Sequence, residues 1–320
     1  MITANGGKRI ALAGKKQMKI KTGGVLQMTL AMVISGTVGW PVVLLGQPPA
    51  TVVFWRCAFG ALAMLIACAL LGLLKKGMLT QRQAAIAVLG GIALVLNWVM
   101  LFGAYTHASI AVATVTYHVQ PFMLVGLGVL FFGEKMTATK FGWLVLAFVG
   151  MLLIISGKQD GGDASADYFT GVLLALGAAF MYAVAAAIVK RLKEVPPHLI
   201  VLIQLTLGVV LLAPFAGWAQ LPSTANGWLL LATLGLVHTG LMSSLLYSAI
   251  QKIPTALVGA LSFIYPLVAI IVDWAVFGHR LSLMQLSGAA AILLAAAGMN
   301  FGWRLVRENR ANRPSSDNAA

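Results

Sequence analysis

Ten long apolar segments restrict what this chain can fold into more strictly than any other feature. A helix needs roughly 20 mostly apolar residues to cross the hydrocarbon core of a bilayer. Segments of about that length, separated by charged or Pro/Gly-rich breaks, lie at about 24–44, 51–74, 83–105, 109–132, 138–156, 169–190, 198–217, 227–249, 255–277 and 282–303. Their residues lack the alternation of an outer-membrane barrel. The sequence predicts an all-α membrane protein with ten transmembrane helices.

Composition and the placement of charge agree with this class. Only 9% of the 320 residues are charged, whereas soluble domains carry about 25%. A net charge of +14 would suggest nucleic acid in a soluble protein. With a cytoplasmic N-terminus, however, 19 of the 22 Lys and Arg residues fall on the cytoplasmic side, which follows the positive-inside rule. We expect a multi-pass protein of the bacterial inner membrane, with both termini cytoplasmic and the lipid bilayer, not nucleic acid, as its partner.

The chain contains an internal repeat. Shifted by 145 residues, Gln120-Pro121 falls on Tyr265-Pro266 and "FGEK" falls on "FGHR", with no gap from about 101 to 302. An odd number of helices per copy makes the second copy enter the membrane from the opposite side, so the halves form inverted repeats around a central cavity. The predicted parts are a basic cytoplasmic N-terminus (1–23), a first five-helix repeat (24–157), an outer linker (158–168), a second five-helix repeat (169–303) and a basic disordered cytoplasmic tail (304–320).

Over nearly its whole length the chain resembles the EamA-type members of the drug/metabolite transporter superfamily. The resemblance rests on the ten segments, the five-plus-five repeat, the "P…FFGEKMT" and "P…VFGHRLS" segments, and Arg56 after "PPATVVFW". His279 stands where the first half has Glu134, a departure that puts any role of that acid in doubt in the second half. Within the family, the chain is most similar to exporters of aromatic and other neutral amino acids.

Prolines interrupt two equivalent segments near the middle of the membrane. Pro121 cannot donate to the carbonyl of Tyr117, and Pro266 likewise frees the carbonyl of Ser262. Irregular backbone at this depth is tolerated only where it is buried in protein or lines a wet cavity. We therefore predict the substrate site here and bending points at Pro41, Pro121 and Pro266; the alternative is an ordinary kink that serves packing.

Polar and aromatic side chains beside these prolines predict the lining of the cavity. Aromatic rings suit flat apolar ligands, while hydroxyl, amide and imidazole groups fix their orientation. The predicted lining residues are Trp40, Asn97, Trp98, Tyr105, Tyr117, His118, Gln120, Tyr182, His238, Ser244, Tyr247, Ser262 and Tyr265. For each aromatic residue the alternative is lipid-facing packing or the interfacial belt. Trp143, Trp218, Trp228, Trp274 and Trp303 lie near segment ends and are assigned to that belt.

Charged groups within the segments are few. Arg56 and Asp273 are predicted to form an ion pair or outer gate, or to bind a substrate carboxylate, because intramembrane charges usually pair or face water. His118 and His238 either shuttle a proton or act as neutral hydrogen-bonding groups. No Asp or Glu lies at mid-depth, which favours a facilitator over a proton antiporter. No metal-binding or phosphate-loop motif is present, so we expect no metal, cofactor or ATP drive.

These features together predict a non-enzymatic secondary transporter that works by alternating access. Its substrates would be small neutral metabolites, most of all aromatic or other apolar amino acids, moved outward by uniport. The alternative is a proton-coupled exporter of drugs or of cationic or aromatic compounds. A lipid-modifying enzyme would need catalytic acids beside His107 and His279, and the short tails do not fit a receptor. Gly298 and Gly302 are interpreted as packing within the bundle, which favours a monomer.

Overall fold

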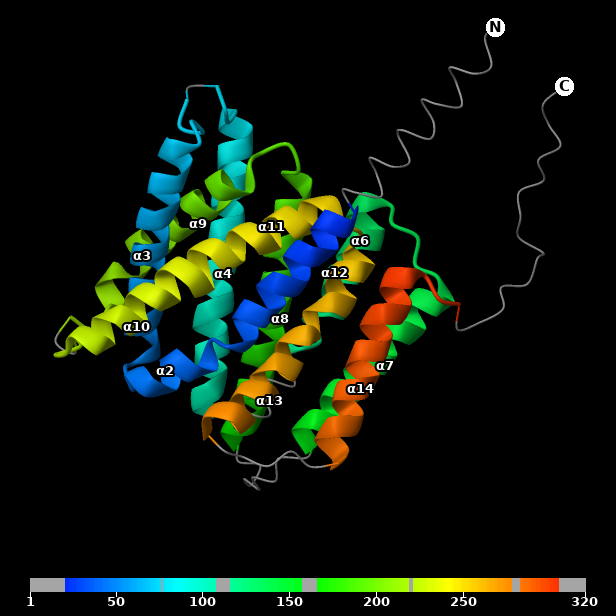
Figure 1. Cartoon of the computed structure of the whole chain (residues 1–320). Coiled ribbons are helices and arrows are strands. Elements are labelled where there is room, and N and C mark those ends of the chain that lie inside the picture. Colours follow the sequence, from blue (N-terminus) through cyan, green and yellow to red (C-terminus); the bar gives the residue numbers. More distant parts are fainter. Residues whose placement is uncertain are drawn as a thin grey trace, which may run out of the picture.

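The computed structural model describes residues 21–75, 77–107, 116–156, 166–218, 221–277 and 283–304. Every regular element in these ranges is helical (Figure 1), which confirms the predicted all-α class for them. In chain order the elements are a helix over residues 21–36, α2 (Gly39–Leu45), α3 (Pro49–Leu70), α4 (Gln81–His107), α6 (Gln120–Phe132), α7 (Ala138–Ser156), α8 (Ala166–Arg191), α9 (Pro197–Leu212), η1 (Ala213–Phe215), α10 (Ala225–Gly235), the π-helix η2 (Leu236–Leu241), α11 (Met242–Lys252), α12 (Thr255–Ser262), α13 (Ile264–Phe277) and α14 (Leu283–Phe301).

Helix occurs in each of the ten predicted segments, but not every segment is one long helix. Six helical stretches of the described chain are long and apolar enough to cross a bilayer: Lys21–Val42, Ala50–Leu70, Gln81–Leu101, Phe169–Arg191, Pro197–Phe215 and Ala225–Lys252. Three shorter apolar helices are Gln120–Phe132, Ala138–Leu153 and Leu286–Met299. The segment over 255–277 is divided between α12 and α13. The count of ten crossings therefore stays a prediction.

Three predicted parts fall outside this description. The basic N-terminus, the outer linker and the tail lie mostly within residues 1–20, 157–165 and 305–320, which are not among the described residues. They likewise stay predictions.

Proline and glycine mark several helix ends. α3 begins at Pro49 and α9 at Pro197, each after another proline. Proline suits the first helical position because the N–H that it lacks would have no partner there. α6 ends at Phe132, and the φ of 62° at the next residue, Gly133, is the left-handed conformation that glycine adopts without strain. Helix starts at the Pro-Pro pairs thus follow directly from the sequence.

The helices pack in the same pairs when each helix is replaced by its counterpart in the other half. α3 packs on α9, α6 on α12 and α7 on α14, and each pair joins corresponding segments of the two halves. α4 packs along α8. The corresponding pair is α11 and the helix over 21–36, where Gln27 accepts hydrogen bonds from Ser248 and Lys252. In Figure 1, α7 and α14 lie side by side at one edge of the bundle.

Trp143 was predicted in the interfacial belt, and that assignment is wrong. Its side chain is only 4% exposed, and the indole N–H donates to the carbonyl of Trp303 at 3.1 Å. Gly298 on α14 makes room for it, because a Cβ added to this glycine would overlap the Trp143 ring. The Gly298 position of the G-x-x-x-G pattern thus serves packing of α14 on α7, as the bundle interpretation expects.

Candidate functional site

The helices are interrupted where several predicted site residues lie. A turn at His118 and Val119 precedes α6, and Phe263 separates α12 from α13. Each interruption begins three residues before a proline, Pro121 or Pro266, so the two positions correspond under the 145-residue shift. The amides after Pro121 bond irregularly: those of Phe122 and Met123 both donate to the carbonyl of Val119, at 3.0 and 3.3 Å. A further turn, at residues 37–38, separates the first helix from α2 and lies just before Pro41.

The π-helix η2 lies between α10 and α11, and no pattern in the sequence predicts it. π-Helical turns within α-helices are frequent at functional sites. Here Thr239 donates its hydroxyl to the carbonyl of Leu234 at 2.7 Å. Gly235 just before η2 lets α3 approach closely, since an added Cβ would overlap Phe59 and lie 3.1 Å from the backbone nitrogen of Gly60. This close approach sets one turn of α3 against η2.

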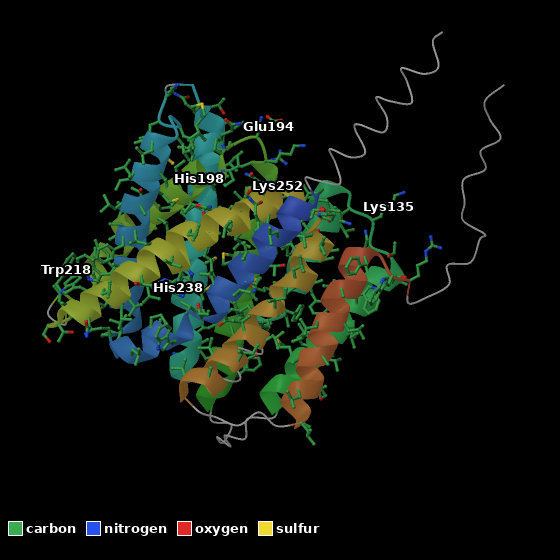
Figure 2. The ribbon with its side chains drawn as sticks, viewed as in Figure 1. Lys135, Glu194, His198, Trp218, His238 and Lys252 are labelled. Atoms are coloured by element: carbon green, nitrogen blue, oxygen red, sulfur yellow. The ribbon has the colours of Figure 1, made fainter. Side chains whose placement is uncertain are left out.

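Side-chain contacts between the two halves connect residues at these interrupted parts of the helices. Thr37 in the first half and His238 in η2 lie within hydrogen-bond distance, 2.9 Å from Oγ1 to Nε2. Figure 2 shows His238 between the end of the molecule that carries Trp218 and the end that carries Lys252. His118 stacks on Tyr265 with ring centroids 5.6 Å apart and planes inclined by 20°. Residues of both halves therefore meet at mid-bundle.

A cavity of about 100 Å³ opens beside these contacts. Its walls come from α3, α4, α8, η2 and α11, together with Tyr117 just before α6. Polar or aromatic side chains make up much of the lining: Arg56, Asn97, Trp98, Tyr117, Tyr182, Thr239, Ser243 and Tyr247. Five of these belong to the predicted lining, and Arg56 was predicted as a gate or carboxylate-binding residue. Thr239 and Ser243 were not predicted, because no sequence pattern marks the π-helix that contains Thr239 or its junction with α11, where Ser243 lies.

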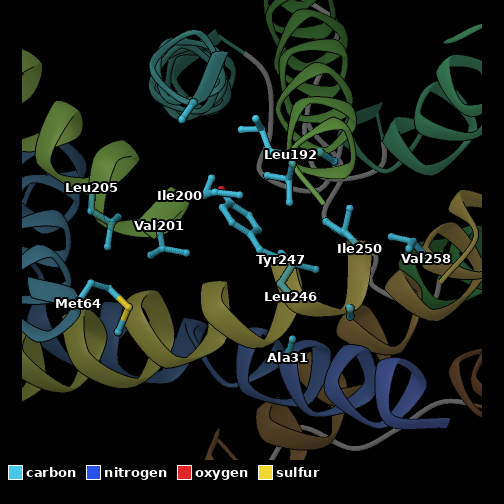
Figure 3. Packing of buried hydrophobic residues seen from close by; sticks show 14 of the residues in the cluster. Ala31, Met64, Leu192, Ile200, Val201, Leu205, Leu246, Tyr247, Ile250 and Val258 are labelled. Atoms are coloured by element: carbon cyan, nitrogen blue, oxygen red, sulfur yellow. The ribbon is translucent and has the colours of Figure 1, made fainter. Parts of the chain in front are cut away.

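Hydrogen bonds fix the orientation of the lining groups. The Asn97 amide donates to the carbonyl of Ala178 at 2.8 Å and to the Tyr117 hydroxyl at 3.1 Å. The Tyr117 and Tyr182 rings meet edge to face, with centroids 6.3 Å apart. Tyr247, which Figure 3 shows between Ile200 and Ile250, donates its hydroxyl to the side-chain carbonyl of Gln204. These contacts fix the positions of the Tyr117, Tyr182 and Tyr247 rings in the cavity wall.

Arg56 is the one charged residue in the lining. Its Nε donates to the Thr239 hydroxyl at 3.1 Å, and its guanidinium carbon lies 6.0 Å from the centroid of the Trp98 ring. Within the described part of the chain, no carboxylate pairs with it. The predicted partner Asp273 belongs to α13, but its side chain lies outside the described residues, so that pairing stays a prediction.

The other predicted residues are not among those that line the described cavity. Ser244 donates to the sulfur of Met64 at 3.2 Å, and Ser262 donates to the carbonyl of Gly259 at 2.7 Å. Trp40 is 44% exposed. Gln120 is buried, and its Oε1 has no hydrogen-bond partner among the described residues. The side chains of Tyr105 and Pro266 lie outside the described residues.

A second cluster joins the halves at one end of the bundle, and we call it the Glu134 clamp. The carboxylate of Glu134, just after α6, accepts hydrogen bonds from the backbone N–H of Thr255, at 3.0 Å, and from the Thr255 hydroxyl. It also pairs with Lys190 Nζ at 3.0 Å, and that ammonium donates to the carbonyl of Ile253 at 2.7 Å. Glu134 thereby caps α12, which has no side-chain cap of its own.

Opposing effects act on the pKa of Glu134. Partial burial favours the neutral acid, but the hydrogen bonds from Thr255 and Lys190 and the charge of Lys190 outweigh it and hold the pKa below its usual value. The carboxylate is therefore charged at neutral pH. The sequence pointed to this residue only through the "FGEK" motif and did not predict its partners.

Known proteins resemble this chain in both sequence and fold. The model of the EamA-like transporter family matches residues 22–156 and again 169–301. An uncharacterized transporter of Bacillus subtilis, YxxF, is 28% identical over 88% of this chain and 89% of its own length. A probable amino-acid metabolite efflux pump of Salmonella typhimurium is 26% identical over 62% of this chain and 70% of its own. The pseudopaline exporter CntI of Pseudomonas aeruginosa is 26% identical over 59% and 64%.

A solved crystal structure shares the fold. It superposes with a TM-score of 0.76 over 92% of this chain and 99% of that chain, at 18% sequence identity. At this identity the likeness concerns the arrangement of helices alone.

Proposed function

The chain belongs to the EamA-like transporter family, and on that basis we propose that it exports small neutral metabolites, most of all aromatic or other apolar amino acids. The observation that carries this proposal is the cavity between the repeats. Its rings, Trp98, Tyr117, Tyr182 and Tyr247, offer flat apolar surfaces, and its hydroxyl and amide groups can orient a ligand.

Export would proceed by alternating access between two inverted five-helix repeats. The interruptions at His118 and Phe263 would act as bending points, because helix hydrogen bonds are already missing there. The Glu134 clamp would close one end of the cavity and separate when that end opens. In this cycle the contacts between the halves, rather than those within each half, change.

We assign the clamp to the cytoplasmic end of a bacterial inner-membrane protein with both termini in the cytoplasm. The positive-inside distribution of Lys and Arg supports this orientation. Figure 2 shows Lys135 and Lys252 toward one end of the bundle, whereas Trp218 lies at the other. The clamp residue Lys190 lies next to Ile253, at the Lys252 end.

Facilitated transport fits the lining better than proton coupling to cationic drugs. A cation exporter needs a negative or strongly accepting site, and proton coupling commonly uses an intramembrane carboxylate. No Asp or Glu lines this cavity among the described residues, and its only charged group is the cation Arg56. These features support a uniporter that moves its substrate down a concentration gradient.

The test is counterflow of labelled phenylalanine in liposomes that contain the purified protein, with and without an imposed pH gradient. We expect saturable flux that the gradient does not change. A parallel sample with a cationic dye examines the competing function. Dye movement that follows the proton gradient, without phenylalanine flux, would overturn the proposal.

A further inference from the structure

We propose that Arg56 binds the carboxylate of the substrate and that this contact, not one to an ammonium group, selects what the protein carries. The substrate class then extends from apolar amino acids to apolar monocarboxylic acids that lack an amino group. This inference rests on the proposed transport function and specifies its binding site.

The geometry of the Arg56 guanidinium suits a carboxylate. The Thr239 hydroxyl donates its proton to the carbonyl of Leu234. Its oxygen is therefore the acceptor of the hydrogen bond from Nε of Arg56. The two terminal nitrogens of Arg56 have no hydrogen-bond partner among the described residues. They form a planar fork of donors, which matches the two oxygens of a carboxylate.

The charge of Arg56 also favours a ligand with a carboxylate. Taking a charge out of water is costly unless a partner offsets it. Arg56 lines an interior cavity, no described carboxylate pairs with it, and the lining includes no acidic side chain. The Trp98 ring offsets part of the cost through its π face, 6.0 Å from the guanidinium carbon. A carboxylate brought in by the substrate supplies the negative charge that the described lining lacks.

An ammonium group would find weaker partners in this cavity than a carboxylate does. The described lining offers it only neutral acceptors, such as the hydroxyls of Tyr182 and Ser243. Hydrogen bonds between an ion and a neutral group are weaker than a bidentate pair between two ions. The positive charge of Arg56 also repels an ammonium group. Recognition therefore depends on the acid end of the ligand, while the rings of Trp98 and Tyr117 contact its apolar end.

Three probes that differ by one group test this inference: L-phenylalanine, 3-phenylpropionate without the ammonium, and phenethylamine without the carboxylate. Each competes with labelled phenylalanine in proteoliposome counterflow. We expect 3-phenylpropionate to compete about as well as phenylalanine and phenethylamine to compete at least tenfold more weakly. Comparable inhibition by phenethylamine would overturn the inference while leaving amino-acid transport intact.

Variants of Arg56 provide the second readout. In Arg56→Gln we expect the concentration of 3-phenylpropionate for half-inhibition to rise about 10- to 100-fold, as loss of a charge-assisted hydrogen bond predicts, with partial recovery in Arg56→Lys. Arg82→Gln, at the first turn of α4, is the matched control and should behave as wild type. An unchanged half-inhibition in Arg56→Gln contradicts the inference.

A binding measurement separates this inference from the proposed function. Quenching of tryptophan fluorescence in purified wild-type protein reports ligand binding without transport. If no probe is transported but 3-phenylpropionate binds and phenethylamine does not, the transport proposal fails and the carboxylate site stands. If phenylalanine is transported but neither binding nor competition depends on the carboxylate, the transport proposal stands and the carboxylate site is wrong. The wild-type probe series gives this result even if the Arg56 variants do not fold.

Discussion

Glu134 and Lys190 form an ion pair of 3.0 Å that ties the first repeat to the second. The same carboxylate holds the first residue of α12, and the same ammonium holds the carbonyl of Ile253 just before it. Three chain segments thus meet at one carboxylate: the end of α6, the last turn of α8 and the start of α12. Separating the two repeats at this end would break the bonds of Glu134 to both Lys190 and Thr255.

Glu134→Gln should open the clamped end more often. Glutamine still accepts hydrogen bonds, but it removes the charge that pairs with Lys190, and both side chains are mostly shielded, at 15% and 22% exposure. We expect a several-fold faster reaction of a cavity reporter, Ser243→Cys, with an impermeant maleimide in inside-out vesicles. Cys57 and Cys68 are buried and contribute little background. Lys193→Gln, an exposed neighbour, is the control; equal labelling of all three proteins argues against the clamp as a gate.

The clamp should not respond to pH in the physiological range. Its surroundings lower the pKa of Glu134, so the stabilisation is complete above the carboxyl's unfolded pKa of about 4.3 and is lost as pH falls through the lower folded value. Reporter labelling, divided by the intrinsic reactivity of the thiol, should be flat from neutral pH down to about 5 and rise only in stronger acid. Glu134→Gln should lack this rise. A midpoint near neutrality would mean that the pKa of Glu134 is raised.

Gly128→Ala should separate α6 from α12. A Cβ at Gly128 would overlap the hydroxyl of Thr255, whereas the same atom at Gly126 in the same helix meets nothing within 4 Å. Overpacking of this kind costs about 1–3 kcal/mol. We expect the thermal unfolding midpoint in detergent to fall for Gly128→Ala and to stay level or rise for Gly126→Ala. Equal midpoints would refute the close contact.

Pro121→Ala should slow transport without weakening binding. Alanine restores an N–H that can donate to the Tyr117 carbonyl four residues back, so the interruption at His118 and Val119 can close. We expect a several-fold lower maximal counterflow rate with an unchanged half-saturating concentration. Pro214→Ala, in the exposed turn η1, is the matched control. A higher half-saturating concentration at normal rate would assign Pro121 to binding instead of bending.

Much of the helical arrangement can be predicted from this sequence because apolar length and proline position report it directly. α7 begins and ends at residues 138 and 156, as the apolar segment predicts, and the Pro-Pro pairs begin α3 and α9. The interruptions before Pro121 and Pro266 also follow from local chemistry, since proline removes a donor wherever it lies.

Features that depend on contacts between distant segments were not predictable in the same way. The π-helix around Thr239 begins where α3 approaches closely at Gly60, and no local sequence pattern marks it. Trp143 lies near the end of its segment, as belt residues do, but Gly298, more than a hundred residues away, gives it a buried place. The partners of Glu134 likewise come from α8 and the start of α12.

The cavity wall has a consequence for the history of the chain. Arg56, Asn97 and Tyr117 come from one repeat, while Tyr182 and Tyr247 come from the other. Neither half encloses a site alone. An ancestor with half the length would have had to insert into the membrane in both orientations and pair with its own inverted copy to hold a ligand. When two such copies are joined in one chain, each half can carry different residues, so a single arginine can serve a wall that two identical halves would supply twice.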